Sequence, residues 1–148
     1  MSRRTIILLI VITIILIIIS VATVVKNPCI KNAYITCDKE LTKDELESCS
    51  NKVEFSCHDS KIYAILFVED LSSKDKITVN WNIIQNNTEK TIQESIIYPE
   101  KDGTGKVIIS LARRNKTLPP GNYTVEIFLN DIKVITRQFN IENSSTTN

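Results

Sequence analysis

The stretch KIYAILFVEDL, residues 61–71, decides the fold class of this chain. Its members from Ile62 to Val68 are all apolar, so a strand built from them has no face that suits water. The stretch therefore predicts a central strand that is buried on both faces. The next stretch, residues 77–83, alternates polar with apolar residues, as a strand buried on one face does; its apolar members are Ile77, Val79, Trp81 and Ile83.

Alternation with a period of two continues to residue 141. Further strands are predicted to begin near Val53 and to cover residues 90–98, 106–111, 123–129 and 133–141. Turn residues separate them, namely Asn86-Asn87, Pro119-Pro-Gly121 and Asn130-Asp131. About seven strands with no long helix between them predict an antiparallel β-sandwich. A parallel topology is disfavoured, because each of its crossovers needs a dozen or more residues.

The sandwich is predicted to occupy residues 58–142, followed by a disordered polar tail, residues 143–148. Trp81 is predicted to lie in the core, because its neighbours two residues away on each side are apolar. A ligand-stacking role for this ring is the alternative. The core is further predicted to contain Tyr123, Val125, Ile127 and Phe139.

Four motifs resemble a pattern found in many exported bacterial and archaeal domains: Lys61-Ile-Tyr63, Ile77-x-Val-x-Trp81, Leu118-Pro-Pro-Gly-Asn-Tyr-Thr-Val125 and Phe139-x-Ile141. The resemblance covers about residues 53–142. It implies an extracytoplasmic immunoglobulin-like β-sandwich, often lipid- or membrane-anchored and usually without an assigned activity. The chain departs from the family in having no lipobox cysteine and in its cysteine-bearing flap. The signature of true immunoglobulin domains is absent, because no cysteine pair brackets Trp81.

The segment before the sandwich, residues 27–57, is predicted to be a flap that packs on it. The segment contains all four cysteines of the chain, and in an exported domain an even number predicts two disulfides. Spacings of seven, eleven and seven residues disfavour the alternative, a metal site. Of the three pairings, the nested one is preferred, Cys37 with Cys49 and Cys29 with Cys57. The capping-box sequence Thr42-Lys-Asp-Glu45 predicts a short helix to about Ser48.

The first 26 residues are predicted to be a cytoplasmic stub and a membrane anchor. Residues 5–25 form a run of 21 residues without a charge, preceded by Arg3 and Arg4. A helix of this length would span about 30 Å, the thickness of the hydrocarbon core. The positive-inside rule then places the amino terminus in the cytoplasm and the domain outside. A signal peptide cleaved near Ala22, giving a secreted domain, is the alternative.

The exported part is nearly neutral and contains candidate glycan acceptors. Without Arg3, Arg4 and Lys26, 15 of the 18 basic residues remain against all 17 acidic ones, a formal charge of −2. No basic patch indicates nucleic acid as a partner. Four N-x-S/T sequons mark possible glycosylation, at Asn86, Asn115, Asn122 and Asn143.

No motif predicts catalysis, a cofactor or a metal ion. His58 is the only histidine, and the sequence has no nucleophile elbow or phosphate loop. The predicted function is therefore a membrane-tethered interaction or accessory domain whose partner is another membrane or surface protein. A carbohydrate- or envelope-binding module is one alternative, with Tyr63, Tyr98 and Phe128 as its candidate rings. An unrecognised hydrolase that uses His58 is the other.

Overall fold

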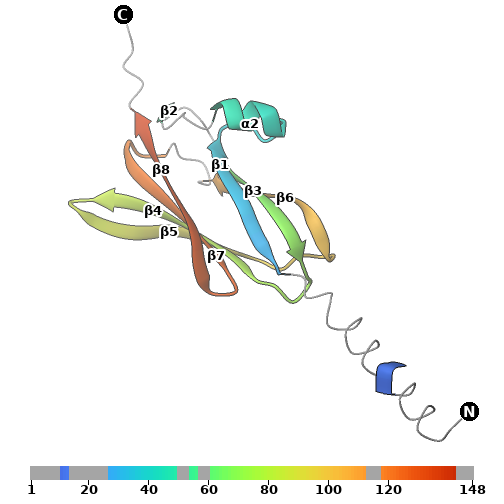
Figure 1. Ribbon diagram of the computed structural model, residues 1–148. Helices are drawn as coiled ribbons and strands as arrows, with labels where there is room; N and C mark the ends of the chain where they lie inside the picture. The colour runs from blue at the N-terminus through green and yellow to red at the C-terminus, as the bar shows by residue number, and fades with distance from the viewer. Residues whose placement is uncertain (1–10, 14–26, 50–53, 57–60, 113–117, 143–148) are drawn as a thin grey trace, which may run out of the picture.

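The protein is described by a computed structural model that covers residues 11–13, 27–49, 54–56, 61–112 and 118–142. Within these ranges the chain from residue 27 onward forms eight strands and one helix (Figure 1). They are β1 (Cys29–Thr36), α2 (Lys43–Cys49), β2 (Glu54–Ser56), β3 (Lys61–Leu71), β4 (Ile77–Gln85), β5 (Thr88–Ile97), β6 (Gly103–Ala112), β7 (Gly121–Leu129) and β8 (Ile132–Glu142).

The strands form two sheets. The three-stranded sheet has the order β1-β3-β6, and the five-stranded sheet has the order β2-β8-β7-β4-β5. Every pairing is antiparallel except β2 with β8. The predicted mostly β fold is confirmed, with one strand more than the sequence led us to expect.

Two of the predicted turns are tight hairpin turns. Asn86 and Asn87 join β4 to β5, and Asn130 and Asp131 join β7 to β8, with φ between 49° and 67° at all four residues. Asparagine and aspartate tolerate this left-handed conformation better than other residues with side chains. The local sequence therefore specifies both hairpins.

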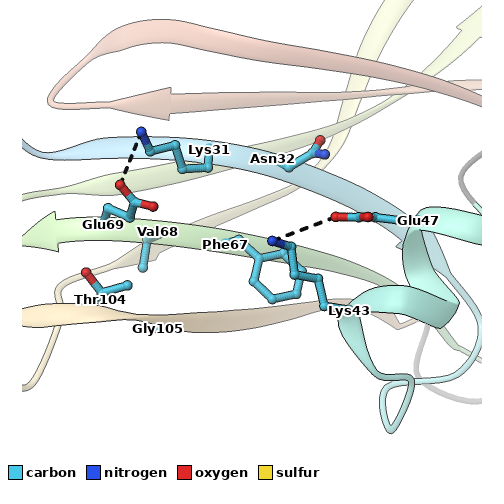
Figure 2. A pocket seen from close by; sticks show the side chains of 9 residues that line it. All are labelled: Lys31, Asn32, Lys43, Glu47, Phe67, Val68, Glu69, Thr104 and Gly105. Carbon is cyan, nitrogen blue, oxygen red and sulfur yellow. Dashed lines mark ion pairs between the residues drawn. The ribbon is translucent and has the colours of Figure 1, made fainter.

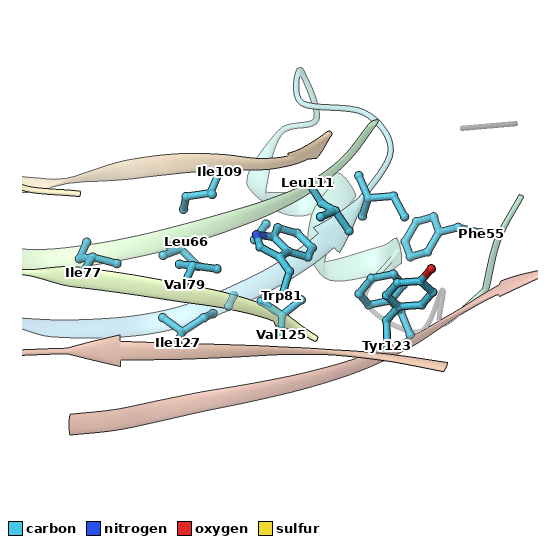
Figure 3. Packing of buried hydrophobic residues seen from close by; sticks show 14 of the residues in the cluster. Phe55, Leu66, Ile77, Val79, Trp81, Ile109, Leu111, Tyr123, Val125 and Ile127 are labelled. Carbon is cyan, nitrogen blue, oxygen red and sulfur yellow. The ribbon is translucent and has the colours of Figure 1, made fainter. Parts of the chain in front are cut away.

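The main core lies between the two sheets (Figure 3). Trp81, Val125 and Ile127 have no exposed surface, and Tyr123 and Phe139 are 1% and 2% exposed. The Phe139 ring stacks on Tyr123 with centroids 5.1 Å apart and meets Trp81 edge-on at 6.2 Å.

Strand β3 is buried on both faces. Its residues Ile62, Ala64, Leu66 and Val68 belong to the core between the sheets. The opposite face contributes Ile65, which is fully buried in a second cluster with Tyr34 of β1 and Leu46 of α2. Helix α2 therefore covers the outer face of the three-stranded sheet.

Helix α2 begins with the predicted capping box. The Thr42 hydroxyl and backbone N–H donate to the Glu45 carboxylate at 2.7 and 2.8 Å, and the Glu45 N–H donates to the Thr42 hydroxyl at 3.4 Å. These hydrogen bonds satisfy backbone N–H groups at the start of the helix, which have no acceptor within the helix itself.

Strand β1 was not predicted, because its sequence CIKNAYIT mixes polar and apolar residues without a sustained alternation. It contains a bulge between Ile30 and Asn32 and buries Ala33, Tyr34 and Thr36. The first part of the predicted flap is thus an edge strand of the sandwich.

Side chains join the edges of the two sheets. Arg137 of β8 donates from Nε to the Ala33 carbonyl and from a terminal nitrogen to Asn32 Oδ1, both at 3.0 Å. On the other side, Gln93 Nε2 of β5 donates to the Ser110 carbonyl of β6 at 2.8 Å. The second bond occupies one carbonyl of the β6 edge.

The membrane assignment is corrected. In the part of the chain that the structure describes, no helix is both long and apolar enough to cross a membrane. Only residues 11–13 of the predicted span are described, as helix; the rest, with the cleavage position near Ala22, lies outside the described residues. The described residues give the predicted single-pass topology no support, and we withdraw that topology together with the membrane as a partner.

Replacing the central ring of the core tests the packing. Trp81→Ala should lower the free energy of unfolding by about 3–5 kcal/mol, because it leaves a large cavity between the sheets. Ile132→Ala is the matched control, since Ile132 is 69% exposed, and it should change stability by no more than about 0.5 kcal/mol. Urea unfolding measures both. A loss below about 1 kcal/mol for Trp81→Ala would place the ring outside the core.

A buried carboxylate beside the β7–β8 turn makes stability depend on pH. Asp75 accepts from Asn130 Nδ2 at 2.8 Å and from the Ser72 backbone N–H at 2.6 Å. These hydrogen bonds, that from Asn130 first, hold the pKa of Asp75 below its usual value. A lowered folded pKa stabilises the protein above the unfolded pKa of about 4 and loses this effect as the pH falls through the folded value.

Asp75→Asn should therefore destabilise the protein at neutral pH, by about 1–3 kcal/mol. The difference from the wild type should shrink when unfolding is measured at a pH below the folded pKa. A difference that stays constant over the whole acid range would show that the charge of Asp75 plays no part.

Candidate functional site

A groove opens on the outer face of the three-stranded sheet, beside α2 (Figure 2). Its volume is about 430 Å³. The lining residues come from β1, α2, β3 and the start of β6: Lys31, Asn32, Lys43, Glu47, Phe67, Val68, Glu69, Thr104 and Gly105.

Charged side chains form two ion pairs at the rim of the groove. Lys31 Nζ lies 3.1 Å from Glu69 Oε2, and Lys43 Nζ lies 3.8 Å from Glu47 Oε1. The hydrogen bond with Glu69 raises the pKa of Lys31, which therefore stays protonated. All four side chains are about half exposed. Such solvated pairs contribute little to stability, so they can exchange partners with the charges of a ligand.

Phe67 supplies an apolar surface between these pairs. The ring is half-buried and meets Tyr34 edge-on, with centroids 5.9 Å apart. Tyr34 in turn packs with Leu46 of α2. The position of the Phe67 ring is therefore set by the same cluster that holds the helix on the sheet.

The β6 side of the groove is an open strand edge. Among the described strands β6 pairs only with β3, and its bond from Gln93 lies at Ser110, away from the groove. A side chain at Gly105 would meet nothing within 4 Å. Lys106 Nζ donates to the carbonyls of Lys39 and Leu41 at 3.3 and 3.2 Å, which fixes the segment before α2 against the strand. The groove thus combines a segment held in place by Lys106, the apolar ring of Phe67 and charged side chains of both signs. This arrangement is suited to binding.

The sequence analysis did not single out these residues. The capping box predicted helix α2, and the apolar residues on both faces of β3 implied that another element buries its outer face. Combined, these two observations could have predicted that α2 packs on the outer face of β3. Lys31 and Asn32 carry no such signal, because β1 was not expected to be a strand.

The predicted disulfides are wrong, since Cys29 and Cys37 are both free thiols. Cys29 pairs with Glu69 at one end of the sandwich, whereas Ser56, the residue before Cys57, pairs with Glu142 at the other (Figure 1). Strand β1 separates these ends by about 26 Å, and a disulfide needs Cα atoms within about 7 Å. Cys57 itself lies outside the described residues, and Cys49 ends α2.

The candidate glycan acceptors differ in their surroundings. Asn86 is exposed in the β4–β5 turn, and Asn122 is exposed near the start of β7. The threonine of the second sequon, Thr124, is buried and hydrogen-bonded to Glu89. Asn115 and Asn143 lie outside the described residues.

The residues named for the alternative functions do not gather at one place. Tyr63 is half-buried on the α2 side of the three-stranded sheet, Phe128 lies on the outer face of the five-stranded sheet, and Tyr98 is 59% exposed beyond β5. His58 lies outside the described residues. Among the described side chains, no group of three or more His, Cys, Asp or Glu could hold a metal ion.

Comparisons with known proteins do not assign the chain to a family. No family model matches it, and no curated protein matches it. Among solved structures, it is similar to the alkylpurine DNA glycosylase AlkC of Pseudomonas fluorescens bound to DNA containing an abasic site analog, with 9% identity and a TM-score of 0.43. The match covers 78% of this chain and 30% of that chain.

A likeness at this TM-score carries no argument about the function of this chain. It therefore neither supports nor opposes the predicted exclusion of nucleic acid.

The free thiols can be tested by alkylation without reductant. Cys37 is exposed and should react with iodoacetamide in the folded protein, which intact-mass measurement would detect. Cys37→Ser should change the free energy of unfolding by no more than about 0.5 kcal/mol. Complete protection of Cys37 until reductant is added, with a loss of about 2–5 kcal/mol on reduction, would restore the disulfide.

Proposed function

We propose that the chain is an immunoglobulin-like interaction domain without catalytic activity. In such sandwiches, strands A, B and E share one sheet, and G, F, C and C′ share the other. Assigned in chain order, β1-β3-β6 corresponds to A-B-E and β8-β7-β4-β5 to G-F-C-C′. This correspondence supports the proposal.

Two local features support the same assignment. Trp81 is buried on β4, where immunoglobulin domains have a tryptophan on strand C. Tyr123, near the start of β7, donates from its hydroxyl to the Pro119 carbonyl at 2.5 Å. This is the geometry of a tyrosine corner, in which a tyrosine near the start of strand F bonds to the backbone a few residues upstream.

The groove beside α2 is the observation that supports binding. We infer that it accepts an extended segment of a partner protein, which lies along the free edge of β6 and places an apolar side chain on Phe67. Backbone hydrogen bonds to an open strand edge provide affinity, and the side-chain contacts provide specificity. The pairs Lys31–Glu69 and Lys43–Glu47 would select a segment that has both acidic and basic residues.

The other two functions receive less support. Carbohydrate-binding modules need aromatic rings on one surface, and Tyr63, Tyr98 and Phe128 lie apart. For the hydrolase, the acidic residues that line the groove are Glu47 and Glu69, and their carboxylates are paired with Lys43 and Lys31.

Photo-crosslinking tests the proposed binding surface. The full chain, expressed in its native host, would carry a benzophenone amino acid at position 67 in the groove or at position 136 on the exposed outer face of β8. We expect one protein to be cross-linked in defined ratio from position 67 and not from position 136. Mass spectrometry identifies the adduct.

Charge reversal provides the matched control. Glu69→Lys should reduce the yield of the cross-link from position 67 by about tenfold, because it places two like charges beside each other. Glu100→Lys, at an exposed loop position, should leave the yield unchanged. Equal cross-linking from positions 67 and 136, or an unchanged yield in Glu69→Lys, would contradict binding in the groove.

A further inference from the structure

Helix α2 is attached to the sheet mainly through one apolar side chain. Leu46 is 1% exposed and packs in the second cluster with Tyr34 of β1 and Ile65 of β3. Every other α2 side chain that the structure describes is exposed, and the ion pair Lys43–Glu47 joins two residues of the helix itself. A helix of seven residues is marginal on its own. The packing of α2 on β3 therefore depends on Leu46.

The chain just before α2 is held by contacts that do not involve the helix. Lys106 Nζ of β6 donates to the carbonyls of Lys39 and Leu41. The Leu41 side chain also packs against the second cluster. If Leu46 leaves the cluster, α2 can therefore move away from β3 while the segment before it stays in place.

One buried leucine gives α2 limited protection against local opening. Burial of a leucine side chain favours the packed state by a factor of about 10–150. Core strands such as β4 open only with global unfolding, which is rarer by several orders of magnitude in a stable domain. We therefore expect α2 to be detached from β3 in about 1–10% of folded molecules.

Detachment of α2 would extend the groove over the outer face of β3. Lys43 and Glu47 line the groove from α2 (Figure 2) and would move with the helix. Ile65 and Tyr34 would become accessible. The Tyr34 ring meets Phe67 edge-on at 5.9 Å, so the newly exposed apolar surface is continuous with the ring already present in the groove.

We propose that α2 is a displaceable cover of the groove. This inference rests on the proposed function, in which an extended partner segment places an apolar side chain on Phe67. Ile65 and Phe67 lie two residues apart on one face of β3, which is the spacing of alternate side chains in an extended segment. When α2 is displaced, the same segment places a second apolar side chain on Ile65, where Leu46 was. The open form binds more tightly, and the small open fraction lowers the apparent affinity.

Hydrogen exchange of the full chain without a partner, at urea concentrations below the unfolding transition, tests the opening. The Leu46 N–H donates to the Thr42 carbonyl at 3.0 Å. Its exchange should be slowed only about 10–150-fold and should depend little on urea. The N–H groups of β4 should be protected far more strongly, and urea should accelerate their exchange. Equal protection and equal urea dependence in α2 and β4 would overturn the proposal.

Leu46→Ala tests whether displacement of α2 favours the partner. The yield of the cross-link from position 67 in the native host should rise about tenfold, because a larger fraction of molecules is open. Ile132→Ala, at a position that is 69% exposed on β8, should leave the yield unchanged. Slow exchange of the β4 amides shows that each variant is folded.

Two other results would count against the cover. A lower or unchanged yield in folded Leu46→Ala, with the wild type cross-linked, would show that the packed helix is part of the binding surface and would overturn the proposal. No cross-link from position 67 in either protein would contradict the proposed function, and with it the partner that displaces α2, even if α2 exchanges independently of β4.

Discussion

The burial of β3 on both faces is the constraint on which the rest of the structure depends. Its apolar residues from Ile62 to Val68 cannot face water on either side. The five-stranded sheet covers one face and α2 covers the other. A helix of only seven residues would be marginal alone, so its contact through Leu46 with Tyr34 and Ile65 is what stabilises it.

This constraint also places the surfaces available for binding. Because α2 covers only part of the outer face of the three-stranded sheet, Phe67 remains half-exposed beside it, and the groove forms there. The outer face of the five-stranded sheet has no helix over it among the described elements, and it carries polar residues instead. The groove and its proposed cover α2 therefore lie together on the outer face of the three-stranded sheet.

Much of the sheet structure follows from local sequence. Alternation located β4 and β7, and the pairs Asn86-Asn87 and Asn130-Asp131 located two turns, because periodicity and left-handed φ are local properties. Strand β1 could not be found in this way, since its pairing with β3 is long-range and its bulge breaks the alternation. The cysteines were misassigned because spacing alone does not show that Cys29 begins β1 at the end of the sandwich away from Ser56.

Hydrogen exchange of the Leu46→Ala variant tests the central claim most directly. If α2 is held on β3 through Leu46, the variant should exchange faster in α2 and in the segment around Phe67. Exchange in β4 and β7, which face the core between the sheets, should stay as slow as in the wild type. No change in α2, or equal acceleration in all strands, would contradict the account in which β3 is covered separately on its two faces.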